Sequence, residues 1–164
     1  MSWTVIDSPV GELRLVEHDG ALTQIEFEPF RPVGQSHDGR PRGARDDNHP
    51  LLVETARQLR AYFDRDLKEF DLPLAPVGTD FQLRVWQGLR EIGYGETSSY
   101  GELAHRLGKS NAASRAVGLA NGRNPIPIVI PCHRVIGANG TLTGYAGGLD
   151  RKQKLLELEQ DALF

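Results

Sequence analysis

The first part of the chain alternates apolar and polar residues, as half-buried β-strands do. The stretch WTVIDSPVGELRLVEHDGALTQIEFE, residues 3–28, is interrupted by Pro-Val-Gly and by Asp-Gly, both of which are turn sequences of β-hairpins. Residues 29–50 are rich in Pro, Gly and charged residues and contain almost no apolar ones. We therefore expect a small antiparallel sheet followed by a flexible loop over residues 29–50.

Apolar residues recur at helical spacing after that loop. Leu52, Ala56, Leu59 and Phe63 fall on one face of a helix, which predicts an amphipathic helix packed on the sheet. These elements together predict a small mixed N-terminal domain over residues 1–78.

The pattern is helical from residue 79 onwards. Thr79 or Asp80 can cap a helix whose buried stripe consists of Phe81, Val85, Trp86 and Leu89. This segment begins a helical C-terminal domain over residues 79–164, so we assign the chain to the α+β class.

Two further short helices are predicted around a turn that contains glycine. They cover SSYGELAHRLG, residues 98–108, where Ser98 or Ser99 is the cap and Gly108 the stop, and NAASRAVGLANG, residues 111–122. This arrangement resembles a helix-turn-helix, a weak signal by itself because many helix pairs of this kind bind nothing.

Small residues dominate the second of these helices, and Arg115 projects from them.

The charge of the chain is unevenly distributed. A net charge of −3 argues against a protein that coats nucleic acid. Residues 97–134 nevertheless contain five Lys and Arg against the single acid Glu102. A solvated basic face, a close-packed core helix and a phosphate-binding surface all remain open from these observations.

The chain of 164 residues contains no stretch near the roughly 18 apolar residues of a membrane-spanning helix. Its start, MSWTVIDSPVG, lacks the basic and then apolar layout of a secretion signal. We expect a cytoplasmic protein that binds no membrane.

The only cysteine, Cys132, lies in PIVIPCHRVIG. It can form neither an internal disulfide nor a zinc site of several thiolates, so it is either a small buried hydrophobe or a reactive thiol. Pro131 restricts the backbone before it. Because neighbours in sequence do not normally face each other, adjacency alone does not place the imidazole of His133 on the sulfur, and both interpretations remain open.

Several motifs together resemble the O6-alkylguanine-DNA alkyltransferase family: NPIPIVIPCHRVIG, SSYGELA, AASRAVG, GYAGGLDRK and LLELE. The resemblance is strong over residues 79–159. Over residues 1–78 the order of sheet and helix fits the family's ribonuclease-H-like N-terminal domain, and the C-terminal domain is expected to be winged-helix-like. The resemblance implies direct transfer of the alkyl group from O6-alkylguanine in DNA to Cys132, once per molecule, with O4-alkylthymine as an open alternative substrate.

The resemblance also implies roles for individual residues. Cys132 is the alkyl acceptor, His133 takes the thiol proton through a water, and Glu159 orients His133. Asn124 braces the active-site turn. Tyr100 donates a proton to the ring nitrogen of the departing guanine.

Three further residues match positions that bind the base: Val135, Tyr145 and Ala146. Some family members carry a serine where this chain has Ala146, so we expect the backbone N–H to be the donor to the oxygen there.

The DNA contact is expected on the second helix of the helix-turn-helix. Arg115 matches the residue that replaces the flipped nucleotide in the base stack, with Ala113, Ser114, Ala116 and Arg123 around it. The partner is then double-stranded DNA, bound in the minor groove by a monomer, with cooperative binding along DNA as an open alternative. We expect no cofactor and no metal, since the N-terminal domain lacks the cysteines that hold zinc in some relatives.

Two other functions compete with this hypothesis. Damage sensors of the alkyltransferase-like type bind lesions without chemistry, but they replace the cysteine that this chain retains. A cysteine hydrolase would also use cysteine, histidine and an acid, and would turn over repeatedly.

Overall fold

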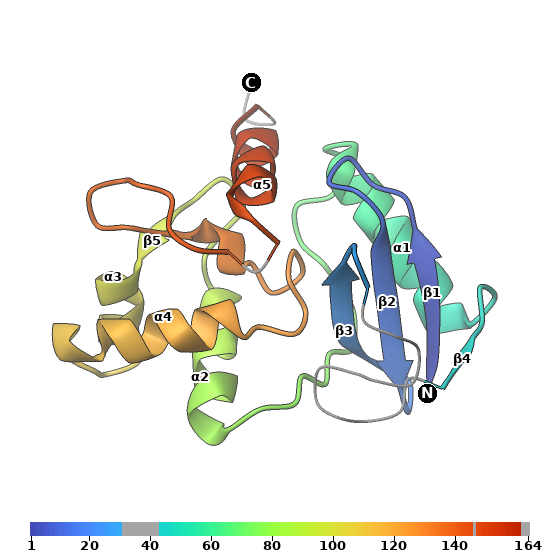
Figure 1. The fold of residues 1–164 in the computed structure, drawn as a ribbon, viewed down its shortest axis with the longest axis horizontal. Helices are drawn as coiled ribbons and strands as arrows, with labels where there is room; N and C mark the ends of the chain where they lie inside the picture. Colours follow the sequence, from blue (N-terminus) through green and yellow to red (C-terminus); the bar gives the residue numbers. More distant parts are fainter. Residues whose placement is uncertain (31–42, 146, 162–164) are drawn as a thin grey trace. The chain divides into compact units, whose positions relative to one another are not determined.

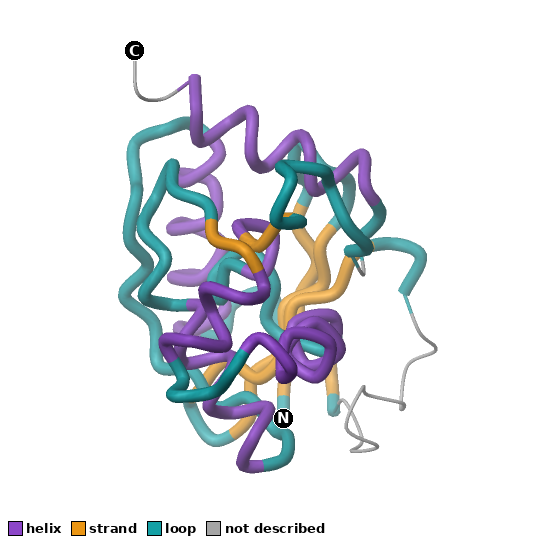
Figure 2. The backbone as a smooth tube through the Cα atoms, turned by 90° about the vertical axis from the view of Figure 1, so that its left-hand side faces the viewer, coloured by secondary structure: helices purple, strands orange, loops and turns teal. Residues whose placement is uncertain are grey.

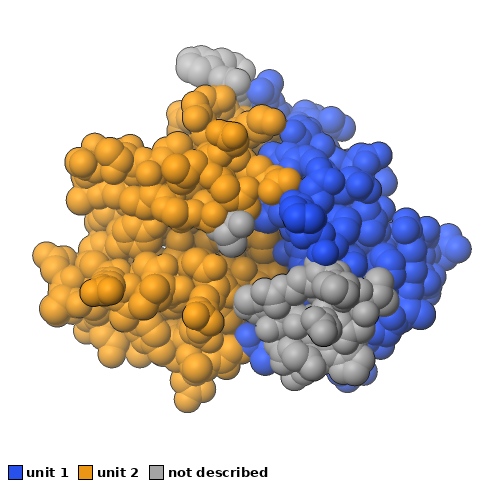
Figure 3. Space-filling view, viewed as in Figure 1, with its two compact units in different colours: residues 1–77 blue, residues 78–164 orange. Residues whose placement is uncertain are grey.

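The computed structural model describes residues 1–30, 43–145 and 147–161 (Figure 1). The chain divides into two compact units, Met1–Val77 and Gly78–Phe164 (Figure 3). The first unit combines a sheet with one helix and the second is mainly helical, which confirms the α+β class.

The sheet of the first unit has the strand order β3-β2-β1-β4. Its strands are β1 (Ser2–Ile6), β2 (Leu13–His18), β3 (Ala21–Phe27) and β4 (Ala44–Arg45). Strands β1, β2 and β3 pair antiparallel, whereas β4 pairs parallel to β1. Asp19 and Gly20 form the two-residue turn between β2 and β3, and both have the positive φ (51° and 80°) that such a turn requires.

The flexible loop predicted over residues 29–50 needs a correction. Residues 31–42 lie outside the described residues, but Ala44–Arg45 form β4 and the next helix already begins at Pro50. Strand β4 forms because the β1 backbone offers an edge: the amide of Asp46 donates to the carbonyl of Trp3 at 2.9 Å.

Helix α1 (Pro50–Phe63) packs on the sheet strands β1, β2 and β3. It begins at His49, whose imidazole Nδ1 accepts the amide N–H of Leu51 at 3.2 Å. Tyr62, and not the predicted Phe63, is the fully buried aromatic residue at its end.

Helices and loops make up most of the second unit, with one short parallel strand pair between β5 and β6 (Figure 2). Two 3-10 turns interrupt these helices: η1 lies between α3 and α4, and η2 lies between α4 and β6. The elements are α2 (Asp80–Leu89), β5 (Ser98–Ser99), α3 (Tyr100–Arg106), η1 (Asn111–Ala113), α4 (Ser114–Gly122), η2 (Cys132–Arg134), β6 (Val135–Ile136) and α5 (Leu149–Asp161).

Caps fix where α2 and α3 begin. Thr79 accepts the amide of Gln82 while the Gln82 side chain accepts the amide of Thr79, a reciprocal capping box. Ser99 accepts the amide of Glu102 at the start of α3.

Among the described residues, no helix combines the length and the apolar character that crossing a membrane would require.

Candidate active site

Two tight turns in succession bring the chain to Cys132. In the first, Ile128 has φ +74°, which a β-branched residue rarely adopts, and the amide of Val129 donates to the carbonyl of Pro127 at 2.9 Å. In the second, Pro131 is the middle residue (φ −81°, ψ 64°), and the Cys132 amide donates to the carbonyl two residues earlier at 2.8 Å. The thiol is therefore held on a backbone of fixed shape.

Asn124 ties these turns together. Its Nδ2 donates to the carbonyl of Ile130 at 2.7 Å, and its Oδ1 accepts the amide of Ile126 at 3.0 Å. The side chain also hydrogen-bonds the sulfur of Cys132. A single buried amide thus contacts both the backbone of the loop and the thiol.

The thiol of Cys132 is buried, with 5% of the residue exposed. Burial raises the pKa of the Cys132 thiol above its ordinary value, while hydrogen bonds from Asn124 and Tyr145 and the charge of Lys152 act in the opposite direction. The thiol is consequently protonated at neutral pH and needs a base before it can act as a nucleophile.

His133 and Glu159 form a buried pair, with Nε2 of the imidazole 2.7 Å from a carboxylate oxygen. Burial alone would raise the pKa of Glu159, but the hydrogen bonds and charges of His133 and Arg134 outweigh it and hold that pKa at about 2. Burial lowers the pKa of His133. A neutral imidazole therefore donates its Nε2–H to a carboxylate, and Nδ1 is left with a lone pair.

Arg134 completes this buried group. Its guanidinium donates to both oxygens of Glu159, at 2.9 and 3.1 Å, and to the carbonyl of Ile92 at 2.6 Å. From the sequence, Arg134 entered only the count of five Lys and Arg over residues 97–134, whereas the structure buries it beside the carboxylate that His133 contacts.

Lys152 is a second buried cation that the sequence pattern did not indicate. Its ammonium is fully buried and donates to the carbonyls of Val135 at 2.6 Å and Thr143 at 3.3 Å. The Thr143 hydroxyl in turn pairs with the phenol of Tyr100. The spacing of Lys152, Leu155 and Glu159 on α5, at i, i+3 and i+7, was a signal that these charged residues share one buried helix face.

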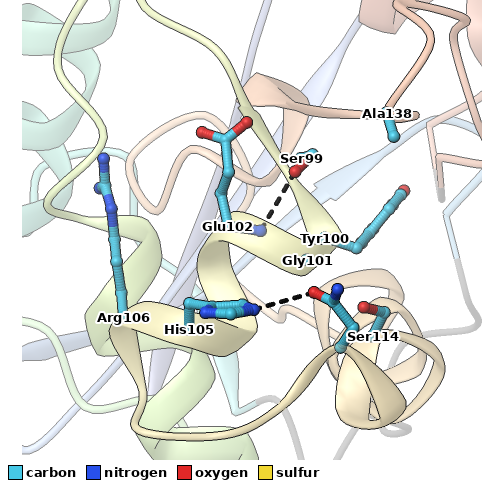
Figure 4. Close-up of a pocket in the computed structure, with 9 residues that line it drawn as sticks. Ser99, Tyr100, Gly101, Glu102, His105, Arg106, Ser114 and Ala138 are labelled. Atoms are coloured by element: carbon cyan, nitrogen blue, oxygen red, sulfur yellow. Dashed lines mark hydrogen bonds between the residues drawn. The ribbon is translucent and has the colours of Figure 1, made fainter.

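Tyr100 also lines a pocket of about 750 Å³ between α3 and the start of α4 (Figure 4). His105 is hydrogen-bonded to Asn111 at 2.9 Å, and Figure 4 shows the ring of His105 turned toward the side of the pocket where Ser114 lies. The pocket therefore connects the residue predicted to protonate the base with the helix predicted to contact DNA. Its lining residues are Ser99, Tyr100, Gly101, Glu102, His105, Arg106, Asn111, Ser114 and Ala138.

The residues predicted to contact DNA lie on or just before α4. Arg115, Ala116 and Arg123 are exposed, and Ala113 and Ser114 are half-buried. Within the described part of the chain, the Arg115 side chain makes no hydrogen bond or ion pair, so its guanidinium is available to a ligand. Leu119, 66% exposed on the same helix, was not singled out from the sequence.

Of the residues predicted to bind the base, Val135 is buried in β6 and Tyr145 is half-buried against the thiol. Ala146 lies outside the described residues. Among those that are described, no three His, Cys, Asp or Glu side chains gather as they would around a metal ion.

Comparison with sequence families covers nearly the whole chain. Residues 1–76 match the "6-O-methylguanine DNA methyltransferase, ribonuclease-like domain", and residues 80–161 match the "6-O-methylguanine DNA methyltransferase, DNA binding domain". The first match agrees with the ribonuclease-H-like fold expected for the N-terminal part.

Individual relatives give the same result. The methylated-DNA–protein-cysteine methyltransferase of Methanosarcina acetivorans is 49% identical over 159 residues, which cover 97% of this chain and 98% of the relative. The Mycobacterium tuberculosis protein of that name is 51% identical over 163 residues, covering 96% and 92%.

Solved structures resemble the whole fold. The crystal structure of the M. tuberculosis O6-methylguanine methyltransferase matches with a TM-score of 0.87 at 48% identity, covering 98% of this chain and 93% of that one. A crystal structure of the M. tuberculosis protein in complex with DNA matches with a TM-score of 0.84, covering 99% and 94%. Sequence, fold and the setting of its single cysteine agree, and the chain belongs to the methylated-DNA–protein-cysteine methyltransferase family.

Proposed function

We propose that this protein repairs O6-alkylguanine in double-stranded DNA by transferring the alkyl group to the sulfur of Cys132. The observation that carries the proposal is the setting of Cys132: a lone, buried, protonated thiol next in sequence to a buried histidine whose far nitrogen is held by an ionised carboxylate. Membership of the family and the structure of a relative in complex with DNA support it.

The reaction is a displacement at the alkyl carbon. His133 takes the proton of the Cys132 thiol through a water, and Glu159 stabilises the imidazolium that forms. The thiolate attacks the alkyl carbon, so that the S–C bond forms while the C–O6 bond breaks. The departing guanine gains one proton, the imidazolium gives up the thiol proton to restore the group that supplied it, and the thioether remains on the protein.

The departing guanine needs a proton donor at its ring nitrogen, and we assign that role to Tyr100. Its phenol already makes a hydrogen bond to Thr143 on the loop that carries Tyr145. Backbone groups at Val135 and residues 145–146 would hold the edge of the base, with Tyr145 as an aromatic wall.

A base inside a duplex cannot reach a buried thiol, so the nucleotide must first be flipped out. We assign the replacement of the flipped base to Arg115, which is exposed and unpaired within the described residues. The small residues Ala113, Ser114 and Ala116 would let α4 enter the minor groove, and Arg123 would contact the backbone. We propose that the protein binds DNA as a monomer.

Intact-mass spectrometry tests the proposal. After incubation with duplex DNA that contains O6-methylguanine, the protein should gain the mass of one CH2 group, and peptide mapping should place it on Cys132. Repair should stop at one equivalent per protein, since the described part of the chain offers no second thiol. Repeated turnover would instead indicate a hydrolase, and DNA binding without a mass change would indicate a damage sensor.

A further inference from the structure

Two side-chain atoms near Cys132 are buried and have no hydrogen-bond partner among the described residues: Nδ1 of His133 and Oδ1 of Asn121. Asn121 lies on α4 and is 2% exposed. Its Nδ2 is 3.4 Å from the carbonyl oxygen of Cys132, so the amide oxygen is the end without a partner. Because buried polar atoms are nearly always hydrogen-bonded, both atoms need a donor.

Both atoms are acceptors, so they cannot satisfy each other. The ionised carboxylate of Glu159 takes the Nε2–H of His133, which leaves Nδ1 with a lone pair. The amide oxygen of Asn121 has no hydrogen to give. Cys132 precedes His133 in the sequence, and its carbonyl oxygen is the group that Nδ2 of Asn121 contacts. Among the described residues no hydrogen bond joins the sulfur to the imidazole, so the thiol proton needs a carrier to reach His133.

One water molecule satisfies all three groups, because it has two hydrogens to donate and two lone pairs. We propose that Asn121 is a positioning residue for alkyl transfer: its amide oxygen and Nδ1 of His133 together hold the water that accepts the Cys132 thiol proton. This inference rests on the proposed function and adds a residue to it.

The proton count fixes the role of Asn121. The water gives one hydrogen to Asn121 and the other to His133, so its lone pairs face the thiol. When the thiol proton moves to the water, the hydrogen directed at Nδ1 moves to His133, and the water remains neutral. Without Asn121 the water can turn away from this orientation, which slows the proton transfer that precedes attack.

Asn124 provides the contrast. It holds the loop backbone through its bonds to Ile126 and Ile130, so its loss should reduce both stability and rate at every pH. Asn121 makes one long bond to the loop, at 3.4 Å, and its proposed effect is confined to proton transfer.

The test uses the free base O6-benzylguanine, which needs no DNA, and measures the rate of its reaction with the parent protein, Asn121→Leu, His133→Ala and the double variant across pH. Asn121→Leu should react roughly 10-fold more slowly near neutral pH, the scale of one lost hydrogen bond, and approach the parent rate at high pH, where hydroxide removes the thiol proton. The double variant should be no slower than His133→Ala, because both residues act on one water.

Several outcomes would overturn the inference. A loss of rate that is equal at every pH, together with a lower free energy of unfolding, would make Asn121 structural. Losses of rate that multiply in the double variant would show that Asn121 and His133 act independently. A slow His133→Ala beside a normal Asn121→Leu would refute the role of Asn121 alone, whereas a His133→Ala protein at the parent rate would refute the proposed activation itself. If Asn121→Leu does not fold, Asn121→Ala, which also lacks an acceptor, serves in the same comparison.

Discussion

Arg134 holds the carboxylate of Glu159 with two hydrogen bonds, at 2.9 and 3.1 Å, in a place where neither side chain is more than 7% exposed. The same carboxylate accepts the bond from His133. His133 and the guanidinium together therefore hold the pKa of Glu159 low and keep the carboxylate ionised beside the imidazole.

We predict that Arg134→Met lowers the free energy of unfolding by about 3–5 kcal/mol, because it leaves a buried carboxylate with one partner fewer. Urea unfolding at pH 7 measures the change. Lys154→Met, which removes an exposed cation from the same helix, should shift stability by less than about 0.5 kcal/mol. Similar values for both variants would show that the Arg134–Glu159 pair adds nothing to stability.

A second prediction concerns stability in acid and follows from the low pKa of Glu159. Folding lowers this pKa from 4.5 to about 2, so the group stabilises the folded state fully above pH 4.5. This contribution is lost as the pH falls from about 4.5 through about 2, and it amounts to about 3 kcal/mol. The free energy of unfolding should therefore fall more steeply over this range in the parent than in Glu159→Gln.

Glu157→Gln is the matched control, because Glu157 is exposed on the same helix. It should keep the acid dependence of the parent. If Glu159→Gln also keeps it, the carboxylate has no depressed pKa, and another group must hold His133.

His133→Ala should slow alkyl transfer by roughly 10²–10⁴-fold, the usual effect of a lost general base. Because burial keeps the thiol of Cys132 protonated, the variant should gain rate steadily as the pH rises, while the parent should depend on pH much less. Single-turnover reaction with O6-benzylguanine across pH measures both. His18→Ala, in the N-terminal unit, should match the parent, and an equally fast His133→Ala would point to another base.

Arg115→Ala separates base flipping from chemistry. If the side chain fills the space of the flipped guanine, its loss should slow repair in duplex DNA at saturating protein, since flipping costs about a few kcal/mol. Reaction with the free base should stay near the parent rate. Equal losses on both substrates would mean that Arg115 supports the active-site fold.

Arg123→Ala is the comparison for a simple phosphate contact. It should weaken DNA binding and make the salt dependence shallower, and higher protein concentration should restore its repair rate. If Arg115→Ala behaves in the same way, Arg115 contacts a phosphate and does not replace the flipped base.

The sequence was informative wherever local chemistry decides the structure. Asp19-Gly20 marked a hairpin because few other pairs accept two positive φ values, and Thr79 and Ser99 marked helix starts because their hydroxyls satisfy free amides. Strand β4 was not predictable, since Ala44 and Arg45 have no strand pattern and pair only because β1 offers an edge.

The candidate site, too, was predictable from the sequence only in part. Resemblance of motifs pointed to the residues next to Cys132, but the buried positions of Arg134 and Lys152 depend on partners distant in sequence, Glu159 and Thr143 among them. Charged residues are rarely buried without such partners, so sequence patterns place them on the surface by default. The position of Asn121 was not predictable from the sequence either, because the carbonyl group that its amide contacts belongs to another segment.

The bond between Tyr100 and Thr143 has a consequence for how the base is selected. A phenol that gives its hydrogen to Thr143 gains little when it exchanges that partner for a ring nitrogen, so in this arrangement Tyr100 would add little to the affinity for any guanine, damaged or not. Negative charge builds up on the base only as the C–O6 bond breaks, and only then does the phenol have a markedly better partner. Tyr100 would discriminate between guanines through the rate of the reaction rather than through the occupancy of the pocket.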